Sequence, residues 1–272
     1  MRATARASER GRETAQAWIT RLPDYAITRY DRNVSLRIGF DVDGVLADFA
    51  AAYHECESRI FGRGRLITRA GDPEREPVVD VDANADPVRN RRGEKDIPHP
   101  AELRRRRDVV WQAIEETPDF WTTLSPLSTG AVGRLHSLML AHQWEVFFIT
   151  QRPATRGDTV QRQTQRWLVE QGFDLPSVLV IPGSRGAAAG ALRLDYHVDD
   201  SPENCMDVKS ESTAKPLLIV DSADDTTVMT ARTLGIGTAS GIEECLDILE
   251  QASIARAQPS LLDRLAKLVG WF

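Results

Sequence analysis

Two aspartates separated by a single residue, Asp41 and Asp43, directly follow the short apolar run Leu36–Phe40 and precede Gly44. Side chains alternate along an extended chain, so residues i and i+2 can face the same side. The glycine lets the chain turn sharply and brings backbone N–H groups close to an anion. Two carboxylates at one strand end repel each other unless a cation lies between them, so the pair points to metal binding.

Polar residues also follow two later apolar runs. Thr150 comes directly after one run, and Asp199 and Asp200 come directly after another. Functional groups of a parallel sheet lie just beyond the carboxyl ends of its strands, so we expect these residues to face Asp41 and Asp43. A site with oxygen ligands alone selects a hard cation, and Mg²⁺ held by carboxylates, water and a phosphate fits it best.

Two arginines lie between or beside these polar residues in the sequence: Arg152 comes two residues after Thr150, and Arg185 precedes Asp199. Both could neutralise the oxygens of a phosphoryl group. Each piece has a structural alternative when taken alone. Asp-x-Asp pairs are common in turns, Thr150 could cap a strand end, and Asp199–Pro202 could be a helix N-cap followed by proline. Together, in order and each at a strand end, they indicate a phosphoryl-transfer site.

The elements that must position these residues are short apolar runs alternating with segments of helical periodicity. This alternation predicts βαβ units and a buried parallel sheet, and therefore an α/β fold. Val160, Thr164, Trp167 and Leu168 share one helical face, on which Thr164 is the one polar member. The expected strands lie at residues 36–40, 146–149, 178–181, 196–198 and 217–220.

The stretch from about residue 50 to 121 breaks this rhythm. Acidic and basic clusters and five prolines between residues 73 and 100 rule out a long helix through most of it. Helical patterns at Ala50–Ile60 and Arg104–Glu116 predict a small inserted lobe with a charged, irregular loop in its middle. The expected organisation is an N-terminal extension at 1–35, a core at 36–49 and 122–255, an insert at 50–121 and a C-terminal amphipathic helix at 256–272.

Composition excludes several classes of protein. The chain has 272 residues, of which 42% are hydrophobic, so it can build a large core and is not disordered throughout. A net charge of −6 argues against a bulk nucleic-acid binder, and the longest apolar runs are too short for a membrane span. Three widely spaced cysteines indicate reduced thiols and a cytoplasmic location. The apolar C-terminal stripe is expected to pack on the domain or on a second subunit, which leaves a homodimer open.

The segment Ile38–Phe49, with the sequence IGFDVDGVLADF, resembles motif I of the haloacid dehalogenase (HAD) superfamily of phosphatases. Phe147–Thr150 resembles motif II, and Val198–Asp200 resembles motif IV. The resemblance covers roughly residues 36–250, with a gap through the charged insert, and implies a Rossmann-like core with a small helical cap inserted after the first strand. Three segments most resemble the 5'(3')-deoxyribonucleotidase branch, namely Val45–Phe49, Pro118–Trp121 and Leu124–Leu127.

The resemblance implies a role for each matched residue. Asp41 would be the nucleophile that forms an aspartyl-phosphate, and Asp43 would protonate the leaving group and then activate water. Thr150 would donate a hydrogen bond to the phosphoryl group. Mg²⁺ would be held by Asp41, the backbone carbonyl of Asp43 and Asp200, with Asp199 acting through water.

The substrate is expected to be a small phosphorylated molecule, with a nucleotide as the first expectation. Phe49 lies where the nucleotidase branch places an aromatic ring beside the nucleoside, and Gln151 and Arg152 are further candidates for substrate binding. Motif III normally supplies a lysine, but here Ser184-Arg185-Gly186 stands in its place, so Arg185 is the candidate cation. Two alternatives stay open: a sugar-phosphate phosphatase or phosphomutase of the same superfamily, and a non-catalytic regulator that binds phosphate or nucleotide.

Overall fold

The computed structural model describes residues 36–62, 100–221 and 224–257. These ranges include the strands and loops that position the aspartates. The predicted N-terminal extension, the charged loop of the insert and nearly all of the predicted C-terminal helix lie outside them.

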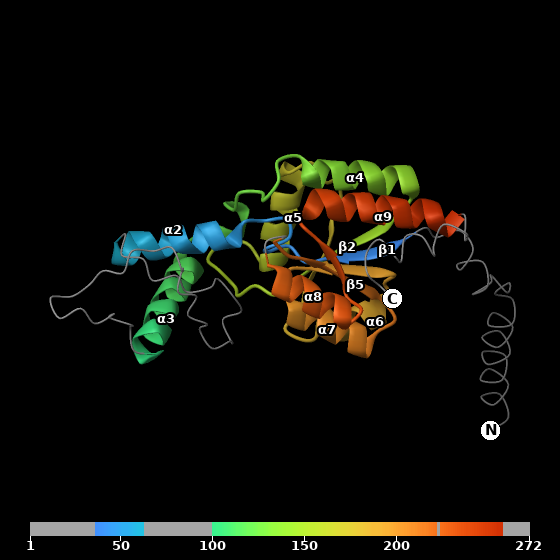
Figure 1. Ribbon diagram of the computed structural model, residues 1–272. Coiled ribbons are helices and arrows are strands. Elements are labelled where there is room, and N and C mark those ends of the chain that lie inside the picture. Colours follow the sequence, from blue (N-terminus) through green and yellow to red (C-terminus); the bar gives the residue numbers. More distant parts are fainter. Residues whose placement is uncertain (1–35, 63–99, 222–223, 258–272) are drawn as a thin grey trace, which may run out of the picture. The chain divides into compact units, whose positions relative to one another are not determined.

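The core is a six-stranded sheet in which every neighbouring pair of strands is parallel (Figure 1). The predicted α/β, Rossmann-like fold is therefore confirmed. Five of the strands coincide with the apolar runs expected from the sequence, and the sixth, a short glycine- and threonine-containing segment, was not predicted. The strands are β1 (Arg37–Phe40), β2 (Glu145–Thr150), β3 (Ser177–Val180), β4 (Tyr196–Asp199), β5 (Lys215–Ile219) and β6 (Gly237–Ala239).

The order of the strands across the sheet is β3-β2-β1-β4-β5-β6. The chain moves outward from β1 to β3, returns to β4 on the other side of β1, and then moves outward to β6. Ligands of such sheets bind where the strand order reverses, beyond the carboxyl ends of the two central strands. Here these strands are β1 and β4, whose carboxyl ends carry Asp41 and Asp199, and the Asp41 N–H donates to the carbonyl of Val198 at 2.8 Å.

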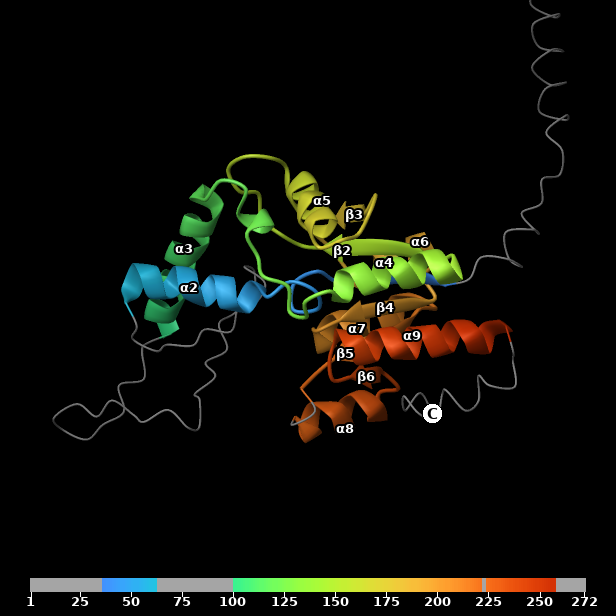
Figure 2. The same ribbon diagram turned by 90° about the horizontal axis from the view of Figure 1, so that it is seen from above.

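Helices cover both faces of the sheet (Figures 1 and 2). One face is packed by α4 (Ala131–His142), α5 (Val160–Glu170) and α9 (Ile242–Ala257), which contribute to the largest apolar cluster. The other face is packed by α6 (Arg185–Leu192), α7 (Pro202–Glu211) and α8 (Asp225–Thr233). Burial on both faces explains why the strands are continuous apolar runs instead of alternating patterns.

The insert contributes α2 (Phe49–Phe61), α3 (Pro100–Glu116) and the 3₁₀ turn η1 (Phe120–Thr122) to the described residues. The two helices confirm the helical patterns expected here, each extended by a few residues. They meet in an aromatic cluster in which the ring of Phe49 stacks on Trp111, with centroids 5.5 Å apart. The other members of this cluster are Tyr53, Phe120 and Trp121.

Two segments that share a branch resemblance in the sequence lie side by side in the structure. The Asp48 N–H donates to the Ser125 carbonyl at 2.8 Å, and the Leu127 N–H donates to the Leu46 carbonyl at 2.9 Å. These paired segments carry the chain into and out of the insert. Asp48 also caps α2, since its side chain accepts a hydrogen bond from the Ala51 N–H at 2.9 Å.

The cysteines are buried and unpaired. Burial raises the pKa of all three thiols, Cys56, Cys205 and Cys245.

Every helix in the described residues is too short or too polar to cross a bilayer.

Candidate active site

Asp41 lies at the centre of a buried cluster of charged groups. It is 6% exposed, and its Oδ1 accepts a hydrogen bond from Nη2 of Arg185 at 3.1 Å. Burial raises the pKa of the Asp41 carboxyl well above its usual value, and the nearby Asp199 raises it further, while Arg185 opposes the shift. Keeping Asp41 ionised in these surroundings therefore costs free energy, which a bound cation would offset.

A tight loop follows β1 and brings the aspartates together. The N–H groups of Leu46 and Ala47 both donate to the Val42 carbonyl, at 2.9 and 2.8 Å, and the Gly44 N–H donates to the Ala47 carbonyl at 3.0 Å. Gly44 has a φ of +78°, a conformation that glycine adopts without the strain of a Cβ atom. The local reason for the turn is thus the glycine that the sequence places after the two aspartates.

Asp199 is held rigidly by donors from its own strand and from α7. Its carboxylate accepts from the Ser201 N–H at 2.9 Å and from Nδ2 of Asn204 at 3.1 and 3.2 Å. Nε2 of His197 lies 3.1 Å from Asp199 Oδ2 and acts as the donor when the carboxylate is ionised. Both Asp199 and His197 are 0% exposed, whereas the neighbouring Asp200 is exposed. Ser201 is also the N-cap of α7 with Pro202 as its first residue, so the predicted cap and the site coexist.

Arg185 is the first residue of α6 and is 5% exposed. Ser184 caps this helix by accepting from the Ala187 N–H at 3.2 Å. Besides its bond to Asp41, the guanidinium lies 3.8 Å from Asp199 Oδ2 through Nε. Arg185 is therefore a buried member of the charge cluster and not a solvated residue at the start of a helix.

Among the buried polar atoms that have no hydrogen-bond partner in the described residues, three belong to predicted site residues. They are Nε and Nη1 of Arg185 and Oγ1 of Thr150, whose residue is 1% exposed. Burying a donor without a partner costs free energy, so a bound group that accepts hydrogen bonds from these atoms would be stabilising. A guanidinium and a hydroxyl are donors to an anion, and the phosphoryl group expected from the sequence fits them.

Asp43 points to a different partner. Its carboxylate accepts two hydrogen bonds from Arg152, Nε to Oδ2 and Nη2 to Oδ1, both at 2.7 Å. The Asp43 side chain is 21% exposed, and that of Arg152 is 0% exposed. Arg152, which was expected to bind substrate, is thus ion-paired with Asp43, the predicted acid and base.

A divalent cation fits the remaining carboxylates. Asp41, Asp199 and Asp200 each offer an oxygen, and these oxygens lie within 4.8 Å of one another. Four carboxylates in the cluster face the guanidinium groups of Arg152 and Arg185, which leaves a formal excess of two negative charges. An all-oxygen donor set with that charge suits Mg²⁺.

Two of the predicted substrate-binding residues form no side-chain hydrogen bond with this charge cluster in the described part of the chain. Gln151 is half-buried directly after Thr150. Phe49 is 8% exposed, and one face of its ring is stacked on Trp111 while its edges meet other rings of the aromatic cluster. Its packing is that of a core residue of the insert, and no open ring face for a base is seen among the described residues.

The structure adds residues that sequence reasoning did not place in the site. Asn204 and His197 hold Asp199, and Thr164 and Trp121 contact Arg152. Thr164 had a signal in the sequence, since it is the one polar member of the helical face that it shares with Val160, Trp167 and Leu168, although the structure buries Gln163 beside it as well. His197 directly precedes the Val198–Asp200 segment and Trp121 ends the Pro118–Trp121 segment, but no pattern in the sequence indicated the contacts that they and Asn204 make.

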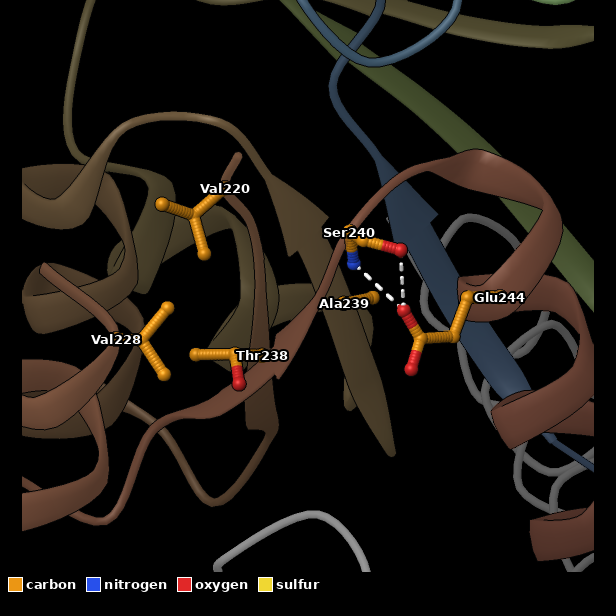
Figure 3. Close-up of a pocket in the computed structure, with 6 residues that line it drawn as sticks. All are labelled: Val220, Val228, Thr238, Ala239, Ser240 and Glu244. Carbon is orange, nitrogen blue, oxygen red and sulfur yellow. Dashed lines mark hydrogen bonds between the residues drawn. The ribbon is translucent and has the colours of Figure 1, made fainter. Parts of the chain in front are cut away.

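A cavity of about 170 Å³ lies away from the aspartates, beside the carboxyl ends of β5 and β6 (Figure 3). One of its polar side chains, Glu244, accepts hydrogen bonds from the N–H and hydroxyl of Ser240 at 2.7 and 2.6 Å. None of the predicted site residues lines this cavity, whose walls are Val220, Val228, Thr238, Ala239, Ser240 and Glu244.

Comparisons with known proteins leave the family open. A scan against protein-family models finds no match to this chain, and a search of curated proteins finds none. Among solved structures, the chain is similar to the crystal structure of a candidate beta-phosphoglucomutase from Thermotoga maritima, with 19% sequence identity and a TM-score of 0.46. The match covers 79% of this chain and 98% of that one. At this identity and TM-score, the activity of the chain has to be argued from its own residues.

Proposed function

We propose that this protein is a Mg²⁺-dependent phosphomonoester hydrolase of the HAD type that acts through an aspartyl-phosphate on Asp41. The proposal rests on the groups that surround Asp41 at the carboxyl ends of β1 and β4, where the strand order reverses. Asp41 lies there beside the carboxylates of Asp199 and Asp200, and Arg185 and Thr150 carry buried donors that have no hydrogen-bond partner among the described residues. The motif resemblance supports the same residues in the same roles.

The reaction that we propose gives these groups the roles that the motif resemblance implies. A carboxylate oxygen of Asp41 attacks the phosphorus atom, and the bond to the leaving oxygen breaks while that oxygen takes a proton from Asp43. Asp43, now ionised, takes a proton from water, and the water oxygen attacks the phosphorus and releases inorganic phosphate and Asp41. Arg185 and Thr150 donate to the phosphoryl oxygens throughout.

Asp41, the backbone carbonyl of Asp43 and Asp200 would hold the metal. Mg²⁺ would supply positive charge that favours ionised Asp41 and offsets charge developing on the phosphoryl group. The saturated hydrogen bonding of Asp199 supports a role in orienting the site, whereas the exposed carboxylate of Asp200 supports direct ligation.

Two candidates remain for the class of substrate. A nucleotide follows from the branch resemblance. A sugar phosphate, hydrolysed by a phosphatase or isomerised by a phosphomutase, is favoured by one observation, namely that the Phe49 ring is only 8% exposed and is stacked on Trp111. A panel of nucleoside monophosphates and hexose phosphates separates these candidates by their kcat/KM values.

Turnover of p-nitrophenyl phosphate with and without Mg²⁺ tests the reaction itself. We expect release of nitrophenol that requires Mg²⁺ and disappears in Asp41→Asn. A protein that binds phosphate in the presence of Mg²⁺ but turns over no phosphomonoester would instead be the regulator left open by the sequence.

A further inference from the structure

Arg152 uses all three nitrogens of its guanidinium on other side chains. Nε and Nη2 donate to the two oxygens of Asp43 at 2.7 Å each, and Nη1 donates to Oγ1 of Thr164 at 2.8 Å. The face of the guanidinium lies 4.7 Å from the centroid of the Trp121 ring, a cation–π distance. Parallel N–H···O bonds from a planar guanidinium fix the plane of the carboxylate as well as its position.

The groups that hold Arg152 are themselves held. Thr164 lies on the buried face of α5 and is 0% exposed, and its hydroxyl donates to the Val160 carbonyl at 2.8 Å. Trp121 is 1% exposed, and its Nε1 donates to the Pro153 carbonyl at 3.0 Å. The Trp121 N–H donates to Oε1 of Gln163 at 3.1 Å. The guanidinium is therefore clamped between α5 and the turn η1.

Asp43 is separated from the group of carboxylates that can share a cation. The oxygens that lie within 4.8 Å of one another belong to Asp41, Asp199 and Asp200, and the Asp43 side chain is not among them. An ionised carboxylate has about four lone-pair sites, of which Arg152 occupies two, so each oxygen keeps one for proton transfer. The partly exposed Asp43 carboxylate can therefore take part in proton transfer while Arg152 fixes its orientation.

We propose that Arg152 is a positioning residue: it orients the carboxylate of Asp43 for proton transfer, and Thr164 and Trp121 hold its guanidinium in place. This inference rests on the proposed function of the site, and it replaces the expectation that Arg152 binds the phosphoryl group. Arg152 keeps its own protons in both steps. The proton that moves goes from Asp43 to the leaving oxygen and later from water to Asp43.

The test separates the two chemical steps with p-nitrophenyl phosphate at saturating Mg²⁺. Nitrophenolate is a good leaving group that departs without full protonation, so formation of the aspartyl-phosphate depends little on Asp43, whereas its hydrolysis needs Asp43 as a base. We expect Arg152→Gln to keep a rapid burst of about one equivalent of nitrophenol and to lose about 10²-fold in the steady rate, with KM no higher than in the parent. Arg152→Lys should recover part of the rate, because it keeps one charged donor.

Matched variants control for the loss of an arginine and for folding. Arg162→Gln removes an exposed arginine from α5, the helix that carries Thr164. Arg162 pairs with Asp158 at 3.1 Å, and its replacement should leave the kinetics unchanged. Thr164→Val removes only the hydroxyl that holds Arg152 and should lower kcat several-fold without changing KM. This variant tests the proposal even if Arg152→Gln fails to fold, which circular dichroism and thermal unfolding would show.

Three results would overturn the proposal. Parent-like kcat in Arg152→Gln, or in Thr164→Val when Arg152→Gln does not fold, would remove the positioning role. A raised KM with unchanged kcat, or loss of the burst, would show that Arg152 contacts the substrate. Failure of the proposed function can be told apart from these results, because the parent itself would then show no Mg²⁺-dependent turnover. The inference about Arg152 would be wrong in that case as well.

Discussion

The side chain of Asp200 lies directly over Gly44, so closely that a Cβ atom on Gly44 would be 2.1 Å from Asp200 Oδ2. The turn after β1 and the carboxylate after β4 can therefore approach each other only because residue 44 has no side chain. This contact ties the geometry of the motif after the first strand to that of the motif after the fourth.

Gly44→Ala should therefore abolish most of the Mg²⁺-dependent turnover and also destabilise the fold. The left-handed conformation alone costs about 1–2 kcal/mol for a residue with a Cβ. Gly130→Ala is the matched control, since Gly130 has a φ of +85° but no atom within 4 Å of the added Cβ. Thermal unfolding should show a comparable backbone penalty in both variants, while only Gly44→Ala loses activity. Equal activity in the two would contradict the role of this contact.

Asp41→Asn should eliminate turnover and make the metal-free protein more stable at neutral pH. Because the pKa of Asp41 is raised in the folded state, folding takes up a proton between the ordinary pKa and the raised one. The stability of the parent therefore falls as pH rises through that interval, and the asparagine variant lacks this loss. Melting temperatures measured in chelator across a pH series should diverge toward neutral pH and converge at acidic pH. Parallel curves would show that Asp41 is ionised at no cost.

The adjacent aspartates Asp199 and Asp200 should differ in what their removal changes. Asp200→Ala should raise the Mg²⁺ concentration required for half-maximal activity more than Asp199→Ala, because a direct ligand contributes more to affinity than a supporting residue. Asp199→Ala should be the less stable variant, since it strips buried donors of their acceptor. Mg²⁺ titrations and thermal unfolding of both variants measure the two effects. The reverse order of Mg²⁺ requirements would exchange the two roles.

Arg185→Ala should lose about 10²–10³ in turnover, the usual effect of removing one charge-assisted donor from a preorganised site. Arg185→Lys should retain activity, because it restores the residue that the resembled superfamily carries at this place. Arg193→Gln, which removes an exposed arginine at the other end of α6, is the control. Steady-state kinetics at saturating Mg²⁺ decide the matter, and parent-like turnover in Arg185→Ala would exclude Arg185 from the site.

The position of Arg185 should also depend on how closely α6 packs against α7. A Cβ on Gly186 would lie 2.2 Å from the backbone oxygen of Asp207, whereas a Cβ on Gly190 would lie 3.5 Å from its nearest neighbour, the Glu211 oxygen. Gly186→Ala should push the helices apart and lower both stability and kcat. Gly190→Ala should be neutral or stabilising by about 0.5–1 kcal/mol, as in other helix interiors. Urea unfolding and kinetics of the two variants provide the comparison, and similar behaviour would refute the packing argument.

Much of the fold could be predicted from the sequence because its signals are local. A parallel strand covered on both faces must be a continuous apolar run, which is how β1 through β5 were recognised. The three-residue strand β6, Gly237–Ala239, carries no such run and is defined by its pairing with β5. The polar residues at the ends of β1, β2 and β4 could be expected to meet because all carboxyl ends of a parallel sheet lie at one edge.

The sequence by itself determined the fold class, the strand ends and the carboxylates that gather there. Only the tertiary structure decided how these groups are paired. Arg152 contacts Asp43 across 109 residues of sequence, and Arg185 contacts Asp41 across 144. Whether a guanidinium faces a ligand or another side chain depends on packing by Thr164 and Trp121, which come from elements distant in the chain. Residue types and spacing specify which groups reach the sheet edge, but distances between helices and loops select the partner of each group.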